Sequence, residues 1–185
     1  MNTNTNTKTK ATTAYPLVIC GVFAAVMVVC SWIAIPLPSA VPINLAVLGV
    51  LLSAGCLGFK YGTLTQLVYV LLGCVGLPVF AGFNGGLHVI AGPTGGYIVG
   101  YILCAGIVSF IASRTKSFWA LVGAMILGVL ACYAFGTLWY VHLMDITFAV
   151  GLAQCVIPFL PFDAIKIALA ALLVQRLRHT NLIKL

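Results

Sequence analysis

Six apolar stretches separated by short loops make up most of the chain. They cover roughly residues 15–35, 42–59, 61–77, 94–112, 118–138 and 148–174. A helix that crosses a bilayer needs about 20 apolar residues, with a range near 17–25. The second and third stretches are short and meet at a tight turn around Lys60, between Gly58 and Gly62. The pattern predicts an all-α integral membrane protein with six transmembrane helices.

The polar ends of the chain divide it into three parts. Residues 1–14 alternate Asn and Thr and end with two lysines, a low-complexity composition that is typical of a disordered tail. Residues 15–178 form the predicted six-helix membrane domain. Residues 179–185 form a short C-terminal tail.

Basic residues are distributed unevenly between the loops. If the N-terminus is cytoplasmic, eight of the nine Lys and Arg residues lie on the cytoplasmic side, in the two tails, the Lys60 turn, the loop at 114–116 and the end of the last helix, which carries Arg176 and Arg178. The opposite loops, 36–42, 78–93 and 139–147, hold no Lys or Arg. Cytoplasmic loops of membrane proteins carry an excess of these residues. We therefore expect a multi-pass protein of the cell membrane with both termini in the cytoplasm.

The composition supports a membrane protein and excludes other classes. Hydrophobic residues make up 63% of the chain and charged residues 6%, against about 25% charged residues in a typical soluble domain. The net charge of +7 does not indicate nucleic-acid binding, because the basic residues are few and dispersed and stand where membrane anchors stand. The seven cysteines form no Cys-x-x-Cys motif, so we interpret them as small buried hydrophobes. We expect no metal ion and no cofactor.

Three loop segments on the outer side are apolar and rich in proline or glycine. They are residues 36–42, 77–86 and 91–97. Irregular backbone at membrane depth is tolerated only where it is buried in protein or lines a cavity. We predict that these segments fold over the bundle as a lid above a binding cavity.

One pair of charged residues stands inside the last apolar stretch. Lys166 follows Asp163, one of two acids in the chain, by three residues, so the two share a helix face. Charged groups in the membrane cost roughly 2.5–3.5 kcal/mol and usually mark a substrate or ion path. A carboxylate and an ammonium together suit a neutral ligand group with both N–H and C=O, such as a cyclic urea or amide. A structural ion pair that pins two helices is the alternative.

Two polar residues in the outer loops are further candidates. Asn84 is either a turn residue in the left-handed region or a ligand contact that offers both a donor and an acceptor. Thr94 is a candidate N-cap for the fourth helix, where backbone N–H groups are able to face a carboxylate. The sequence contains no nucleotide-binding loop and no Gly-x-Ser-x-Gly or His-Glu-x-x-His motif, so an enzyme is not indicated.

The first apolar stretch contains a strip of small residues. Gly21 precedes Ala25 by four positions, and Cys20 precedes Ala24 by the same spacing. Such strips allow membrane helices to approach closely. Packing inside the bundle and docking of another membrane subunit are both open.

Three motifs follow one another along the chain: Leu-Pro-Val-Phe-Ala-Gly at 77–82 with Asn-Gly-Gly at 84–86, Gly-Pro-Thr-Gly-Gly-Tyr at 92–97, and Pro-Phe-Asp-Ala-Ile-Lys at 161–166. Taken in this order, they resemble the BioY family, the biotin-binding substrate (S) components of energy-coupling factor (ECF) transporters. The resemblance covers nearly the whole chain. It implies a six-helix S-component fold that binds biotin from outside with high affinity. S components for other small vitamins and a purely structural membrane subunit remain alternatives.

The resemblance also implies roles for individual residues. It places the carboxylate and the lysine of the third motif at the ureido ring of biotin. One departure concerns the segment after the first proline loop, where the family more often has Pro-x-Thr-x-Gln and this chain has Pro-Ile-Asn-Leu-Ala at 42–46. The role of Asn44 and Ala46 therefore stays open. The predicted biotin-binding residues are Asn84, Gly92, Thr94, Tyr97, Asp163 and Lys166.

The partners follow from the resemblance as well. In the family, small-residue strips on the first helix dock a transmembrane coupling subunit (EcfT), and two ATPase subunits of the EcfA type complete the transporter. The matching positions here are Cys20, Gly21, Ala24 and Ala25. The chain itself has no site for ATP, so it would borrow its energy from these partners.

Overall fold

The computed structural model describes residues 5–36 and 41–180. This part of the chain is helical apart from one antiparallel pair of two-residue strands. In order, the elements are α1 (Thr5–Trp32), β1 (Ala34–Ile35), β2 (Ile43–Asn44), α2 (Ala46–Cys74), the 3-10 helix η1 (Ala81–Phe83), α3 (Leu87–Ala91), α4 (Gly95–Ala112), α5 (Phe118–Met144), α6 (Phe148–Cys155) and α7 (Leu160–His179).

The helices confirm an all-α protein with several candidate membrane spans. Four helices, α1, α2, α4 and α5, are long and apolar enough to cross a membrane, and α6 with α7 makes a fifth if the bent pair counts as one span. The bend between α6 and α7 is 53°. It falls at Pro158 and Pro161, residues that break or kink a helix, and Pro161 lies in the first turn of α7.

The second helix reverses direction at a glycine. Gly58 has φ 71° and ψ 177°, a conformation that is essentially restricted to glycine. Beyond it, the Gln66 side chain donates a 2.8 Å hydrogen bond to Ser53 Oγ, thirteen residues earlier, whereas a continuous helix would separate them by about 20 Å. The two parts of α2 therefore run antiparallel, as the predicted turn at Lys60 requires.

Helices α1 and α5 both extend beyond the apolar stretches that predict them. Helix α1 begins at Thr5, inside the segment 1–14 that the sequence indicates as disordered; residues 1–4 lie outside the described part. Once a helix is nucleated, adding further residues to it costs little free energy. The helix that the apolar stretch forms therefore continues backwards into the polar tail. Helix α5 continues to Met144, beyond the predicted end at 138, and includes Trp139.

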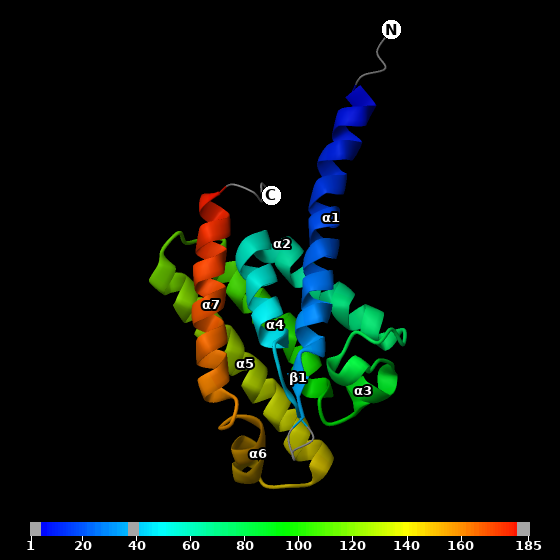
Figure 1. The fold of residues 1–185 in the computed structure, drawn as a ribbon, viewed down its shortest axis with the longest axis vertical. Helices are drawn as coiled ribbons and strands as arrows, with labels where there is room; N and C mark the ends of the chain where they lie inside the picture. Colours follow the sequence, from blue (N-terminus) through cyan, green and yellow to red (C-terminus); the bar gives the residue numbers. More distant parts are fainter. Residues whose placement is uncertain (1–4, 37–40, 181–185) are drawn as a thin grey trace.

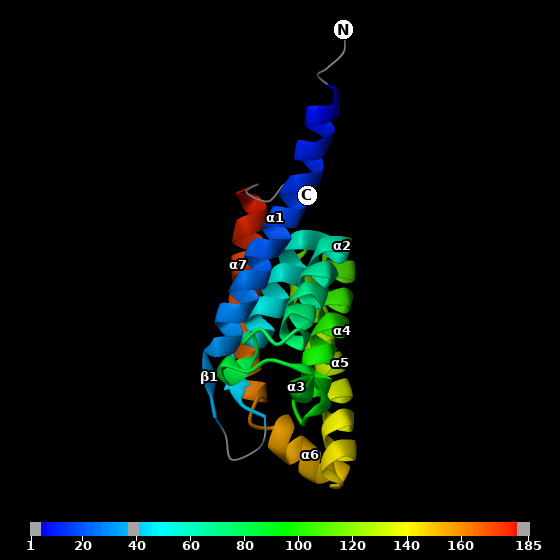
Figure 2. The same cartoon turned by 90° about the vertical axis from the view of Figure 1, so that its right-hand side faces the viewer.

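The elements are arranged around two distinct ends of the bundle. The terminal end carries the start of α1, the Gly58 reversal, the loop between α4 and α5, and the end of α7 (Figure 1). The lid end carries the β1–β2 pair, α3 and α6 (Figure 2). This places the loops predicted as basic together at one end and the apolar outer loops together at the other.

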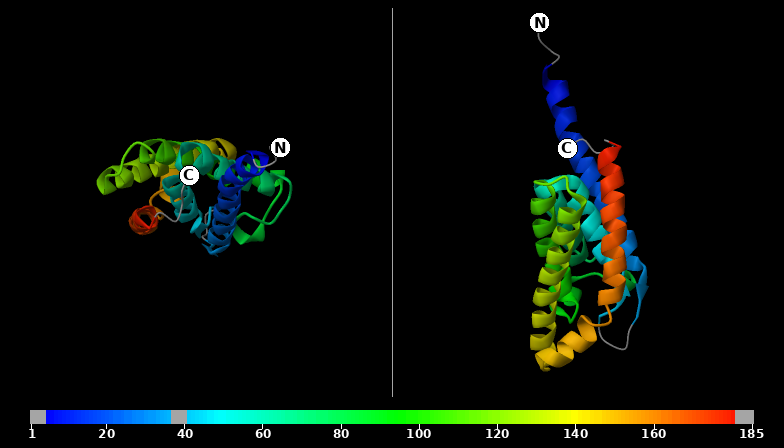
Figure 3. Two further views of the ribbon diagram at one scale, coloured as in Figure 1. Left: turned by 90° about the horizontal axis from the view of Figure 1, so that it is seen from above. Right: turned by 90° about the vertical axis from the view of Figure 1, so that its left-hand side faces the viewer.

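The centre of the molecule is formed by α2, α4 and α5. Helix α4 packs against both α2 and α5, and α1 packs against α2. Viewed along the bundle, α7 stands to one side of the layer that α4 and α5 form (Figure 3). Side chains with no exposed surface fill the centre, among them Val50, Leu51, Ala105, Val108 and Met125.

Arg178 closes the terminal end. Its guanidinium donates hydrogen bonds to the backbone oxygens of Gly55 at 2.7 Å, Ala112 at 2.9 Å and Thr115 at 3.3 Å. Sequence reasoning treated Arg178 as one of the flanking basic residues, but the side chain is half-buried. It ties α7 to α2 and to the loop after α4.

The strip of small residues on α1 is split between two faces. Cys20 and Ala24 are 5% and 4% exposed, and the Cys20 thiol faces the backbone oxygen of Tyr61. The prediction that these two residues dock a partner is wrong, because they pack against α2 inside the bundle. Gly21 and Ala25 lie on the exposed face, and a side chain added at Gly21 would meet nothing within 4 Å.

Candidate ligand-binding site

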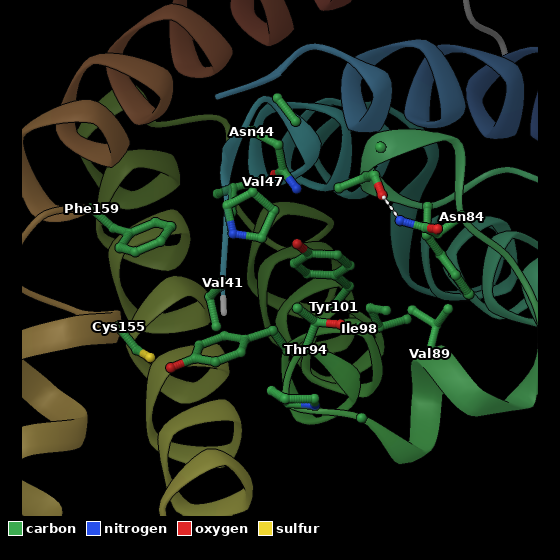
Figure 4. A pocket seen from close by; sticks show the side chains of 18 of the residues that line it. Val41, Asn44, Val47, Asn84, Val89, Thr94, Ile98, Tyr101, Cys155 and Phe159 are labelled. Atoms are coloured by element: carbon green, nitrogen blue, oxygen red, sulfur yellow. Dashed lines mark hydrogen bonds between the residues drawn. The ribbon is translucent and has the colours of Figure 1, made fainter. Parts of the chain in front are cut away.

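A cavity of about 670 Å³ occupies the lid end of the bundle. Its walls come from β2, α2, α4, α5, the start of α7 and the segments predicted to form a lid (Figure 4). The cavity brings together all six residues that the sequence predicts as one binding site, namely Asn84, Gly92, Thr94, Tyr97, Asp163 and Lys166.

The charged pair forms part of the cavity wall. Lys166 Nζ lies 2.6 Å from Asp163 Oδ1, and the residues are 4% and 2% exposed. The Tyr133 hydroxyl donates to the second oxygen, Asp163 Oδ2, at 2.5 Å. Asp163 lies in the first turn of α7, where the helix dipole stabilises a carboxylate.

This geometry bears on the alternative of a structural ion pair. Asp163 and Lys166 belong to the same helix, so the ion pair itself joins no two helices. The hydrogen bond from Tyr133 does link α5 to α7. An ion pair whose charges line a cavity is able to exchange part of its bonding for bonds to a ligand, which a pair packed between helices is not.

Tyrosines from three helices surround the cavity. The Tyr97 hydroxyl is hydrogen-bonded to Thr137 Oγ1 at 2.9 Å, and the Tyr69 hydroxyl to Ser31 at 2.8 Å. Tyr101 lies one helical turn after Tyr97 and also lines the cavity. Sequence reasoning missed Tyr69, Tyr101 and Tyr133; only Tyr101 had a signal, because residues i and i+4 share a helix face.

The segment whose role was left open lines the cavity too. Asn44 stands at the end of β2, and its side-chain oxygen accepts a 3.0 Å hydrogen bond from the Ala46 amide. Figure 4 shows the Asn44 and Tyr101 side chains on the same side of the cavity. Ala46 is buried and does not line the cavity.

Asn84 occupies the rim of the cavity in an extended conformation. Its φ of −88° and ψ of 158° exclude the alternative of a turn residue in the left-handed region. Positive φ values fall instead at Gly82 (72°) and Phe83 (59°). The Asn84 amide donates a 3.0 Å hydrogen bond to the Ala81 oxygen (Figure 4), which fixes its orientation and leaves its own carbonyl oxygen as an acceptor.

The predicted lid segment at 77–86 is anchored by aromatic contacts. Phe80 is buried, meets the Tyr69 ring at 5.5 Å between centroids, and fills the space beside Gly73, where an added Cβ would stand 1.9 Å from the ring. At the outer edge, Trp32 Nε1 donates a 2.7 Å hydrogen bond to the Pro78 oxygen. The Trp32 ring also packs on Phe83 at 4.8 Å.

The second motif forms another part of the cavity wall. Thr94 occupies the N-cap position of α4, as predicted, but its side chain makes no capping hydrogen bond and faces the cavity (Figure 4). The Gly92 oxygen accepts a 3.0 Å hydrogen bond from Trp139 Nε1. Tyr97 lies against Gly136, where a Cβ would come within 2.3 Å of the ring.

The described residues offer no cluster of three or more His, Cys, Asp or Glu side chains that would hold a metal ion. His88, which belongs to α3, lines the cavity. The polar groups of the cavity are therefore an acid, a lysine, a histidine, amides and hydroxyls. They suit recognition of an organic molecule by hydrogen bonds.

The fold and the cavity together define a class. Helices long and apolar enough to cross a membrane, around a cavity with a buried charged pair in its wall, are typical of a membrane protein that captures a small polar molecule. The model of the BioY family matches residues 1–182. The chain belongs to the BioY family.

Individual relatives and a solved structure agree with this family. The chain is 45% identical to the biotin transporter BioY of Thermotoga maritima, over 88% of this chain and 95% of the relative. It is 34% identical to the biotin transporter BioY of Rhodobacter capsulatus, over 84% and 88%. The fold matches a crystal structure of the S-component for biotin from an ECF-type ABC transporter, with a TM-score of 0.84, 27% identity, and coverage of 96% and 95%. The resemblance drawn from the three motifs is confirmed.

Proposed function

We propose that this chain is the biotin-binding S component of an ECF-type vitamin uptake transporter. The observation that carries the proposal is the buried Asp163–Lys166 pair in the wall of a 670 Å³ cavity, in a chain whose relatives are biotin transporters. Biotin enters from the lid end and leaves toward the terminal end. The energy for this release comes from partner subunits.

The ureido ring of biotin matches the charged pair. Its two N–H groups donate to a carboxylate, and its carbonyl oxygen accepts from an ammonium group. We infer that Asp163 receives the N–H groups and that Lys166 donates to the ureido oxygen, while Tyr133 holds the carboxylate in place. Charge-assisted hydrogen bonds of this kind are about twice as strong as neutral ones. Aromatic and aliphatic residues such as Ile98 and Phe159 provide the apolar surface that the thioether ring and the side chain need.

The topology we propose has six membrane crossings with both termini in the cytoplasm. The reversal at Gly58 supports counting α2 as two crossings, and α6 with α7 as one. The gathering of basic loops at the terminal end supports the orientation. The lid end then faces outward, where an uptake protein first meets its substrate.

The partners we propose are a transmembrane coupling subunit (EcfT) and two ATPase subunits (EcfA type). Gly21 and Ala25 form a flat exposed strip on α1 that supports close helix packing. A bulky substitution, Gly21→Leu, is expected to abolish co-purification with the coupling subunit while leaving biotin binding intact. Val26→Leu, at an exposed position on another face of α1, is the matched control.

Equilibrium binding of labelled biotin to the detergent-purified chain tests the function, with thiamine and riboflavin as unlabelled competitors. Nanomolar binding that only biotin displaces is the expected result. Displacement by another vitamin would identify an S component of different specificity. Folded protein that binds none of the three would contradict the proposal and favour a structural subunit.

A further inference from the structure

A second hollow lies between α5 and α7, on the outside of the bundle. It is a groove of about 510 Å³, and it exists because α5 packs mainly on α4 and because Ala168 on α7 is too small to fill the space. Figure 3 shows α7 set apart from the layer of α4 and α5. Apart from Tyr133 and Asp163, the walls are apolar and include Trp119, Val122, Ile126, Leu130, Ala168 and Leu172.

The groove and the biotin cavity share a wall. Tyr133 and Asp163 line both hollows, so the partition between them is one hydrogen-bonded pair of side chains thick. On its other side the groove faces the hydrocarbon of the bilayer, because α5 is a candidate membrane span and α7 belongs to the bent pair that forms another. An unfilled groove would forfeit dispersion contacts along its whole lining, and hydrocarbon is the material available to fill it.

The mouth of the groove at the terminal end is basic. Phe118 and Trp119 line the groove at the start of α5, and the exposed Lys116 stands two residues before Phe118. Arg176, also exposed, lies one helical turn beyond Leu172 on α7. The first turn of α5 holds no acidic residue and has no side-chain cap, so its N-terminal dipole adds to the positive potential. This arrangement complements a phosphate.

We propose that the α5–α7 groove binds one anionic phospholipid. An acyl chain occupies the groove behind Tyr133 and Asp163, and the phosphate lies between Lys116 and Arg176. The site is separate from the biotin cavity and does not depend on which vitamin that cavity holds. By filling the groove, the acyl chain keeps the rear of the charged pair free of water.

Native mass spectrometry of the detergent-solubilised protein tests the site, with titrations of phosphatidylglycerol and phosphatidylcholine of identical acyl chains. One phosphatidylglycerol is expected to bind in preference to phosphatidylcholine. Ala168→Leu fills the groove and is expected to weaken binding of both lipids at least tenfold. Lys116→Gln is expected to weaken only phosphatidylglycerol, by roughly fivefold, the effect of about one basic residue near a membrane surface. Ala120→Leu, exposed on α5 outside the groove, is the matched control.

Two results would overturn the site. One is equal retention of phosphatidylglycerol by Ala168→Leu and Ala120→Leu, with both variants monodisperse and helical by circular dichroism. The other comes from the unmodified chain and needs no variant: phosphatidylglycerol with a photoactivatable acyl chain is expected to label peptides of α5 and α7. Labelling spread evenly over α1 and α4 would contradict a specific groove.

Discussion

Helix α7 carries two buried or half-buried cations whose surroundings are opposite in kind. Lys166 faces the lid-end cavity and pairs with a carboxylate on its own helix. Arg178, twelve residues later and so about 18 Å further along the helix, donates to the backbone oxygens of three residues outside α7. A side-chain partner beside a cavity is free to share its bonds with a ligand. Backbone partners inside a bundle are not.

The acceptors of Arg178 explain why this cation is structural. Gly55 lies in the last turn of α2 before the Gly58 reversal, and Ala112 is the last residue of α4. The last carbonyl groups of a helix have no partner within it, and the negative end of the helix dipole attracts a cation. One guanidinium therefore satisfies carbonyl groups at two helix ends at once and holds the segments of the terminal end together.

The largest effect that this contrast predicts is on biotin affinity. Lys166→Ala leaves Asp163 without its charged partner in a desolvated site, and we expect a loss of at least ~2–3 kcal/mol of binding. Equilibrium binding of labelled biotin measures it, with a dissociation constant raised by a factor of roughly 30 or more.

A matched control keeps this test specific. Lys60→Ala removes an exposed lysine at the α2 reversal and is expected to leave biotin affinity unchanged. If Lys166→Ala and Lys60→Ala bound biotin equally well, the charged pair would be structural, and the difference between the two cations of α7 would disappear.

The next effect is on stability and belongs to the terminal end. Arg178→Ala removes charge-assisted hydrogen bonds to backbone oxygens, each worth about 1.5–3 kcal/mol at most; because the side chain is half-exposed, we expect a total loss of about 2 kcal/mol. For a chain of this size that lowers the midpoint of thermal unfolding by roughly 4–8 °C, measured by circular dichroism in detergent. Arg176→Ala, which removes an exposed arginine, is expected to shift it less.

Biotin binding by the folded Arg178→Ala variant completes the comparison. Its affinity is expected to stay within about twofold of the unmodified chain, because the site lies at the opposite end of the bundle. A large loss of biotin affinity with an unchanged midpoint of thermal unfolding would contradict the assignment of Arg178 to stability and not to binding.

The same contrast shows what the sequence was able to predict. The Asp163–Lys166 pair was predictable because both side chains belong to one helix turn and stand out against apolar neighbours. The role of Arg178 was not, because its acceptors are backbone oxygens that folding brings from 63 to 123 residues away. Every residue has a backbone oxygen, so the residue types in a sequence do not show which oxygen accepts a hydrogen bond from an arginine. Such a contact is therefore visible only once the helices are placed.

The same distinction, between features set by neighbouring residues and features set by tertiary packing, applies to the rest of the fold and site. Local patterns predicted the helices and the reversal near Lys60, since each depends on neighbouring residues. The predictions failed where tertiary packing decides, as in the burial of Cys20 and Ala24 against α2. The cavity residues carried by motifs were found, but Tyr133 was missed because nothing near it in the sequence distinguishes it from a core tyrosine.

Tyr133→Phe sharpens the comparison at the lid end with a smaller effect. The change keeps the ring and removes the hydroxyl that orients the carboxylate of Asp163. We expect a loss of about 1 kcal/mol, a roughly fivefold rise in the dissociation constant for biotin. Tyr140→Phe, which removes a hydroxyl bonded to Gln154 outside the cavity, should bind biotin normally; equal affinities in the two variants would count against a positioning role for Tyr133.

The smallest effect concerns how firmly the lid is held. Trp32→Phe keeps an aromatic ring beside Phe83 but loses the N–H that donates to the Pro78 oxygen. That hydrogen bond is worth about 0.5–1.5 kcal/mol, and its exposed position favours the lower part of the range. Biotin should therefore dissociate roughly two- to fivefold faster, as measured by chase with unlabelled biotin, while the midpoint of thermal unfolding stays nearly constant. A variant with a lower midpoint of thermal unfolding but a normal rate of biotin dissociation would contradict this prediction. Trp32 would then stabilise the bundle, as Arg178 does, and its hydrogen bond would not limit the opening of the lid.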